Sequence, residues 1–193
     1  MTKERLLAFT DGVVAILITI MVLELKVPEG ADWTALKPLL PVFLTYVLSF
    51  IFLGIYWNNH HHMFQMCDRI NGKILWANQH LLFWLSLIPF VTGWMGQNHF
   101  AAVPTATYGI VLLMDAIAYT ILQAALIEEQ GPASPLAEAV GKDSKGKLSA
   151  LLYLAAIPLA FLHQLVADAI YVAVALIWLV PDPRIEKRIA RQE

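Results

Sequence analysis

Hydrophobic residues fall into long runs along the whole chain, separated by short polar or turn-forming segments. A helix that crosses a bilayer needs about 20 consecutive, mainly apolar residues. Runs of about this length predict six membrane-spanning helices, at residues 6–26, 38–60, 73–95, 103–127, 148–163 and 165–181. Only His163 and Gln164 separate the last two runs, which are short, so these runs could form a tight hairpin or cross a thinned bilayer.

The predicted fold class is all-α, a polytopic membrane protein with a single domain over residues 1–193. The bilayer core offers no water to backbone groups, and the runs lack the alternation that is typical of barrel strands. The longest polar linker, 131–147, is too short to hold a separate domain. Lys3 and Arg5 precede the first run as in a secretory signal, but Asp11 interrupts it and no cleavage pattern follows, so we expect a retained helix.

Composition supports this class. The chain is 59% hydrophobic and 15% charged, whereas soluble domains carry about 25% charged residues. Its formal net charge of −2 provides no basic surface of the kind that binds nucleic acid, so the expected surroundings are membrane lipid and not nucleic acid. Cys67 is the single cysteine, which excludes an intramolecular disulfide and a thiolate metal cage.

Lysines and arginines are distributed unequally between the two sets of predicted chain ends and connections. Of the 13 Lys and Arg residues, only Lys26 and Lys37 fall in the first, third or fifth connection. The others lie at the amino terminus, in the second and fourth connections and in the tail: Lys3, Arg5, Arg69, Lys73, Lys142, Lys145, Lys147, Arg184, Lys187, Arg188 and Arg191. Because positively charged loops tend to stay in the cytoplasm, both termini are expected there, as in a multi-pass protein of a bacterial inner membrane.

One face of the first predicted helix carries a regular series of residues. At 100° per residue, seven positions lie between about −60° and +40° around the helix from Ile16, and they form what we call the Ile16 stripe. The Ile16 stripe consists of Arg5, Phe9, Gly12, Ile16, Thr19, Ile20 and Leu23. Asp11 lies on the other side of the helix, at about 220°. Periodicity alone leaves open whether the stripe faces lipid, another helix or a pore.

Motifs in the first three predicted helices resemble a known family. The first helix contains R-L-L-A-F-T-D-G at 5–12, the second ends in W-N-N-H-H-H-M-F at 57–64, and the third combines Asn78 with P-F-V-T at 89–92. These segments resemble the R-x-x-x-F-S-D and W-x-x-H-H-x-x-F motifs of the transmembrane protein 175 family of endolysosomal potassium channels, in its bacterial six-helix form. Thr10 stands where the family usually has serine and keeps the hydroxyl group.

The resemblance implies a homotetramer in which four copies of the first helix surround a pathway for potassium and other monovalent cations. It also implies an apolar gate at Ile16, Ile20 and Leu23, a contribution of Thr19 to selectivity, and potassium ions passing transiently near Ile16 and Thr19. Channels of this family have no T-V-G-Y-G filter, and the sequence contains none. The expected protein is therefore a potassium channel, with no cofactor and no enzymatic activity.

Asp11 and Arg5 need partners outside the predicted pore. Asp11 faces away from the Ile16 stripe, and we expect His60, His61 and Asn78, at the same end of the helices, to hold it by charge-assisted hydrogen bonds. For Arg5, we expect contact with a carboxylate such as Glu4 of a neighbouring subunit or with the Asp11 network, the alternative being a simple anchor on the cytoplasmic side.

Other readings of the sequence remain open. Acids inside apolar segments are functional candidates by default, so a secondary transporter could use Asp115 and Asp168 as a site for a coupling ion. Glu24 is expected near the outer interface, where water can reach it. Consecutive histidines fan out by 100° on a helix, so His60, His61 and His62 do not favour a catalytic metal site. A structural membrane protein is the remaining alternative.

Overall fold

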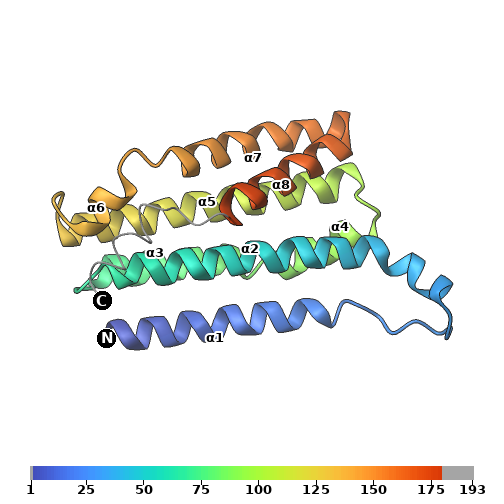
Figure 1. The fold of residues 1–193 in the computed structure, drawn as a ribbon, viewed down its shortest axis with the longest axis horizontal. Coiled ribbons are helices and arrows are strands. Elements are labelled where there is room, and N and C mark those ends of the chain that lie inside the picture. The colour runs from blue at the N-terminus through green and yellow to red at the C-terminus, as the bar shows by residue number, and fades with distance from the viewer. Residues whose placement is uncertain (1, 180–193) are drawn as a thin grey trace.

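The computed structural model describes residues 2–179, and every regular element in that range is a helix. Long helices lie side by side, and the N-terminus and the short helix α6 are at the same end of the bundle (Figure 1). The elements are α1 (Lys3–Val22), the 3-10 helix η1 (Trp33–Leu39), α2 (Leu40–Gln65), α3 (Gly72–Leu85), α4 (Ile88–Gln97), α5 (Ala102–Gln130), α6 (Pro135–Val140), α7 (Ser144–Leu162) and α8 (Gln164–Leu179). The all-α fold class predicted from the sequence is thereby confirmed.

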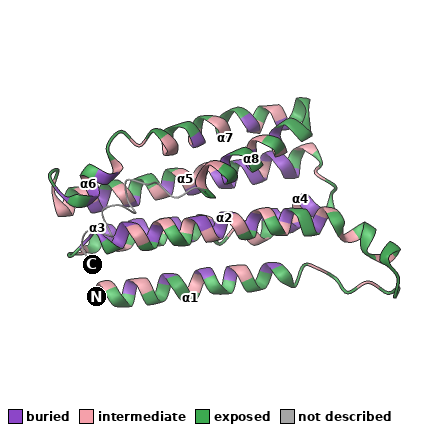
Figure 2. Cartoon of the chain, in the orientation of Figure 1, coloured by how far each residue is buried: buried purple, intermediate pink, exposed green. Residues whose placement is uncertain are grey.

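Helix α1 begins at a capped end and packs through one face. The Thr2 side chain accepts a hydrogen bond from the Arg5 backbone N–H at 3.4 Å, which satisfies one of the free donors of the first turn. The buried face repeats every three or four residues and contains Leu6, Thr10, Val14, Leu17 and Met21. This face packs against α2, α3 and α4, while the other side of α1 is exposed along its length (Figure 2).

The segment predicted as one helix at 73–95 consists of two helices, α3 and α4, with Ser86 and Leu87 between them. Pro89 is in the first turn of α4, where its missing N–H costs nothing. In a continuous helix, however, its ring would collide with the Leu85 carbonyl one turn earlier. The expectation of an unbroken helix was therefore wrong, although Gly72–Gln97 as a whole is long and apolar enough to cross a membrane.

The other boundaries differ from the predicted ones by a few residues, except that the linker 131–147 contains a short helix. This helix, α6, is capped by the Ser134 side chain, which accepts from the Ala137 N–H at 3.2 Å. Helices α7 and α8 pack against each other and are joined at His163, which has an extended backbone conformation. Of the two alternatives for this region, the tight hairpin is the one observed.

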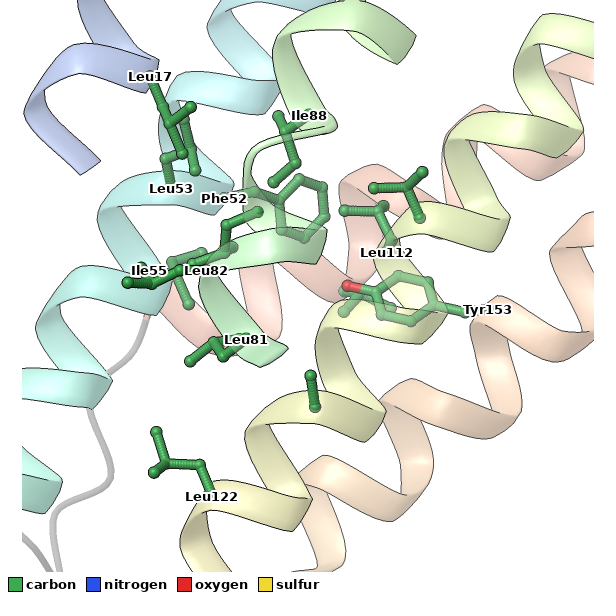
Figure 3. Close-up of a cluster of buried hydrophobic side chains, with 14 of the residues drawn as sticks. Leu17, Phe52, Leu53, Ile55, Leu81, Leu82, Ile88, Leu112, Leu122 and Tyr153 are labelled. Carbon is green, nitrogen blue, oxygen red and sulfur yellow. The ribbon is translucent and has the colours of Figure 1, made fainter. Parts of the chain in front are cut away.

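The buried core joins helices from the whole described chain. Figure 3 shows Leu17 of α1, Phe52 and Leu53 of α2, Leu82 of α3 and Leu112 of α5 directed into a common interior. At the far end of the bundle α4 comes close to α2, because a Cβ on Gly96 would lie only 2.7 Å from the Val42 Cα. Only glycine permits this approach.

Five segments of the described range are long and apolar enough to span a membrane, and α8 is a shorter apolar helix. The end of the predicted segment 165–181 lies outside the described residues. So do the basic tail residues Arg184, Lys187, Arg188 and Arg191.

Candidate functional site

The Ile16 stripe is exposed on the subunit surface. Phe9, Ile16, Ile20 and Leu23 have exposed fractions of 49%, 57%, 44% and 77%, and the stripe lies on the side of α1 turned away from its buried face. A Cβ at Gly12 would meet no atom within 4 Å, so packing within the subunit does not require glycine there.

Thr19 presents an oxygen atom between these apolar side chains. Its hydroxyl group donates to the backbone carbonyls of Ala15 and Ile16, both at 3.0 Å. Because the proton is directed back into the helix, the lone pairs of the oxygen are directed away from it. Thr19 is exposed, so its oxygen can act as a ligand for a cation on this face of α1.

A buried hydrogen-bonded triad connects α1, α2 and α3. The Asn78 side-chain amide donates to the Thr10 hydroxyl oxygen at 3.0 Å, and the Asn78 carbonyl oxygen is 2.8 Å from His60 Nε2. This second contact requires the tautomer of His60 in which Nε2 carries the proton. The exposed fractions of Thr10, His60 and Asn78 are 1%, 3% and 2%, so the triad fixes the rotation of α1 without access of water.

The partners predicted for Asp11 were wrong within the subunit. Asp11 lies one residue beyond the buried Thr10, which turns it by 100° to the edge of the buried face. There its carboxylate accepts a hydrogen bond from the Trp57 indole N–H at 2.8 Å. The His61 ring stacks on Trp57 with 6.2 Å between ring centroids, so His61 supports the donor rather than binding Asp11. Trp57 is the first residue of the motif at 57–64 that also contains these histidines, so the motif could have indicated Trp57 as a partner of Asp11.

The two ends of α1 are attached to the bundle by polar contacts that the sequence did not predict. At the N-terminal end, the Lys3 ammonium donates to the backbone carbonyl of Cys67 at 2.8 Å, just after α2 ends. At the other end, Gln97 of α4 donates to the Glu24 carboxylate at 2.9 Å. Arg5 is exposed, and its guanidinium makes no hydrogen bond or ion pair with residues 2–179 of its own subunit.

Two further acids lie in the part of the bundle that is formed by α5 and α8. Asp115 is completely buried, and Asp168 is half-buried. Both Asp115 oxygens and one oxygen of Asp168 lack a hydrogen-bond partner. No group of three or more His, Cys, Asp or Glu residues within the described range is arranged to hold a metal ion. In particular, His62 contacts Gln65 at 3.4 Å, and His60 and His61 have the separate partners given above.

Five segments of membrane-spanning length, a buried polar triad and an exposed stripe on the first helix define the class: a multi-pass α-helical membrane protein. The family model "Endosomal/lysosomal potassium channel TMEM175" matches residues 5–89. A potassium channel of Chryseobacterium sp. (strain P1-3) is 58% identical over 189 residues, which are 98% of each chain. The chain therefore belongs to the TMEM175 family of potassium channels.

More distant relatives agree with this assignment. A potassium channel of Streptomyces collinus (strain DSM 40733 / Tue 365) is 33% identical over 126 residues, which cover 61% of each chain. The crystal structure of a lysosomal potassium-selective channel TMEM175 homolog from Chamaesiphon minutus matches with a TM-score of 0.80 at 27% identity, covering 92% of this chain and 96% of that one. The family resemblance drawn from the sequence motifs is thus confirmed, and the family is one of channels, not of enzymes.

Proposed function

We propose that four copies of this chain assemble around a central axis, with the Ile16 stripe of each α1 lining a pathway for potassium and other monovalent cations. The exposure of four large apolar side chains together with Thr19 on one face of α1 is the observation that carries this proposal. It is supported by the relatives described as potassium channels and by the fold shared with one of them. A symmetric assembly also buries the stripe against copies of itself.

The proposed gate consists of apolar rings formed by Ile16, Ile20 and Leu23. A cation that enters such a ring must give up water, and the side-chain methyl groups offer no oxygen in return. A narrow apolar ring therefore blocks ions without a charged plug, and widening it admits water and restores conduction. Opening requires the four α1 helices to separate or rotate. Such a movement must change the contacts that α1 makes with α2, α3 and α4.

Thr19 is proposed as the selectivity residue. Its oxygen lone pairs are free of internal donors, so four copies can bind an ion that has lost part of its water. Four hydroxyl oxygens form a weaker ligand set than stacked rings of carbonyls, so the preference for potassium over sodium is moderate. Potassium ions then pass transiently near Ile16 and Thr19.

Arg5 and Asp11 are proposed to act at the edge of the pore and not as ligands within it. The guanidinium of Arg5 has no partner in the described part of its own subunit and is proposed to bind a carboxylate of a neighbouring subunit, for which Glu4 is our candidate. Such a pair would remove the repulsion that four arginines exert at the mouth of a cation channel. Asp11 is held by Trp57 and thereby couples the position of α1 to α2.

We propose that each subunit crosses the membrane six times, with α8 as the sixth span. The membrane is proposed to be the inner membrane of a bacterial cell, with both termini of the chain in the cytoplasm. The described basic residues other than Lys26 and Lys37 lie near the end of the bundle that holds the N-terminus and α6 (Figure 1). This arrangement agrees with the rule that positive residues remain inside. Because the relatives are described as channels, we do not propose the transporter that Asp115 and Asp168 suggested.

Single-channel recording of purified protein in planar bilayers tests the pore assignment. Ile16→Ser hydrates the proposed gate and should raise the open probability, whereas Ile117→Ser, at an exposed isoleucine of α5, should leave it unchanged. Thr19→Val should lower the potassium-to-sodium permeability ratio. Its control is Thr120→Val, which alters an exposed α5 threonine with the same kind of hydrogen bond to its own helix. If each variant had the same open probability and permeability ratio as its control, the Ile16 stripe would not line the conduction path.

A further inference from the structure

A carboxylic acid without a partner lies deep inside each subunit. Asp115 is in the middle of α5, has an exposed fraction of 0%, and neither of its side-chain oxygens has a hydrogen-bond partner within the described range 2–179. An ionised carboxylate in this position would lose its hydration and gain nothing in exchange, which is among the most costly arrangements in a protein interior. The residue is separate from the proposed pore, because the main packing partners of α1 are α2, α3 and α4.

The charged and titratable groups around Asp115 do not provide a countercharge. Its electrostatic neighbours are the phenol groups of Tyr56 on α2, Tyr153 on α7 and Tyr108 on α5 itself. Figure 3 shows the Tyr153 hydroxyl directed from α7 into the interior of the bundle. The remaining titratable groups on the described helices that pack against α5 are Lys73 and His80 on α3, Glu138 on α6, Lys145 and Lys147 on α7, and Asp168 and Tyr171 on α8. None of their side chains is within hydrogen-bond distance of the Asp115 carboxylate.

Three of those basic groups have other partners. Lys73 forms an ion pair with Glu128, His80 accepts a hydrogen bond from the Trp84 indole at 3.0 Å, and the Lys145 ammonium lies 5.7 Å from the centroid of the Trp178 ring. Charge neutrality at Asp115 must therefore come from a bound proton or from a small cation.

A small cavity lies close to the acid. It has a volume of about 50 Å³ and is lined by Ala116, the residue after Asp115 on α5, and by Tyr56 and Tyr153, two of the electrostatic neighbours of Asp115, whereas Asp115 itself is not part of the lining. This volume is enough for water, which needs roughly 10–15 Å³ per molecule on the same scale. The lining also includes Asn59, Tyr119 and Asp143. Asp143 is the N-cap of α7, so the cavity reaches the end of the bundle where that helix begins.

We infer that Asp115 is a proton-binding site within each subunit, which exchanges its proton through this cavity and does not depend on the channel axis. In the exchange, the O–H bond of the neutral acid breaks, the proton passes to a water molecule that reaches the acid from the cavity, and the carboxylate keeps the electron pair. A proton fits the geometry better than a metal cation does. A dehydrated cation needs several oxygen ligands, whereas neither carboxyl oxygen has a hydrogen-bond partner among residues 2–179.

Infrared spectroscopy of the reconstituted full-length protein tests the site directly. Water-exposed acids are ionised at neutral pH, so a carbonyl stretching band of a protonated carboxyl group reports only buried acids. We expect this band at neutral pH in wild type, its loss in Asp115→Asn, and its persistence in Asp168→Asn, which removes the other acid of the same bundle. Asp115→Glu keeps an acid at this position and should shift the band instead of removing it.

Three results would overturn the inference. The first is the absence of the band in wild type, and the second is a band that Asp115→Asn leaves unchanged. The third is a band that is missing in potassium or sodium salts and emerges when a bulky organic cation replaces them, because that result would identify a metal cation as the occupant. Each of these measurements is independent of ion conduction, so the outcome does not depend on the proposed channel mechanism.

Stability as a function of pH provides a second measurement. If the folded subunit holds one proton that the unfolded, water-exposed chain releases at neutral pH, the folded state binds more protons and its stability falls as pH rises. The contribution of Asp115 is about a tenfold change in the unfolding equilibrium per pH unit and per subunit. Asp115→Asn should lose this contribution. An unchanged slope in this variant would contradict proton binding at Asp115.

Discussion

Removal of the Thr10 hydroxyl tests whether the buried triad holds α1 against the bundle. In Thr10→Val, a methyl group replaces the hydroxyl, so the Asn78 amide loses its acceptor at 3.0 Å while the volume is nearly preserved. An unsatisfied buried group costs about 1–3 kcal/mol in soluble proteins. Hydrogen bonds between membrane helices are worth less, on average about 0.6 and at most about 1.7 kcal/mol.

The expected loss for Thr10→Val is in the upper part of the membrane range, about 1–1.7 kcal/mol. Both partners are almost completely buried, and His60 fixes the Asn78 side chain from the other side, so the amide has little freedom to find a new acceptor. The same change in an Asn78→Ala background should cost about 1 kcal/mol less, because the partner is already missing.

The free energy of unfolding can be followed by circular dichroism during titration with SDS, in detergent micelles and at fixed protein concentration, since the assembly is expected to be oligomeric. Thr120→Val is the matched control, because its hydroxyl bonds only to its own helix, to the Ala116 carbonyl at 2.8 Å. If Thr10→Val cost the same in both backgrounds, or no more than Thr120→Val, the triad would not be what positions α1.

Two further predictions concern single residues. Gly12→Ala should leave the fold of the subunit intact, because the added Cβ meets no atom within 4 Å, yet it should change single-channel conductance or tetramer retention in size-exclusion chromatography if the stripe faces other subunits. No effect on either would argue against close approach at Gly12. Burial raises the pKa of the Cys67 thiol from 9.0 to about 11. Because the thiolate is the reactive form, alkylation of native protein by iodoacetamide should be slow at pH 7 and should still be accelerating at about pH 9, below the shifted pKa, while SDS-unfolded protein reacts rapidly. Fast labelling of the native protein at pH 7 would show that the thiol is accessible and not shifted.

The sequence by itself determined the fold class and the composition of the candidate pore face. Both are local properties: a run of apolar residues is enough to predict a spanning helix, and the spacing of residues along one helix is enough to place Ile16, Thr19 and Ile20 on one stripe. The motifs around Asp11 and His60 were sufficient to indicate the TMEM175 family, which the comparisons confirmed.

Only the tertiary structure decided which polar groups meet. Asn78 donates its hydrogen bond to Thr10 and not to Asp11. Asp11 accepts a hydrogen bond from Trp57 instead of from the predicted histidines and asparagine. The same holds for the cavity beside Asp115. The physical reason is that each of these helices is apolar on nearly all sides, so its sequence does not fix its rotation. A rotation of 100°, one residue step, exchanges Thr10 for Asp11, and close packing between helices far apart in the chain selects one of the two.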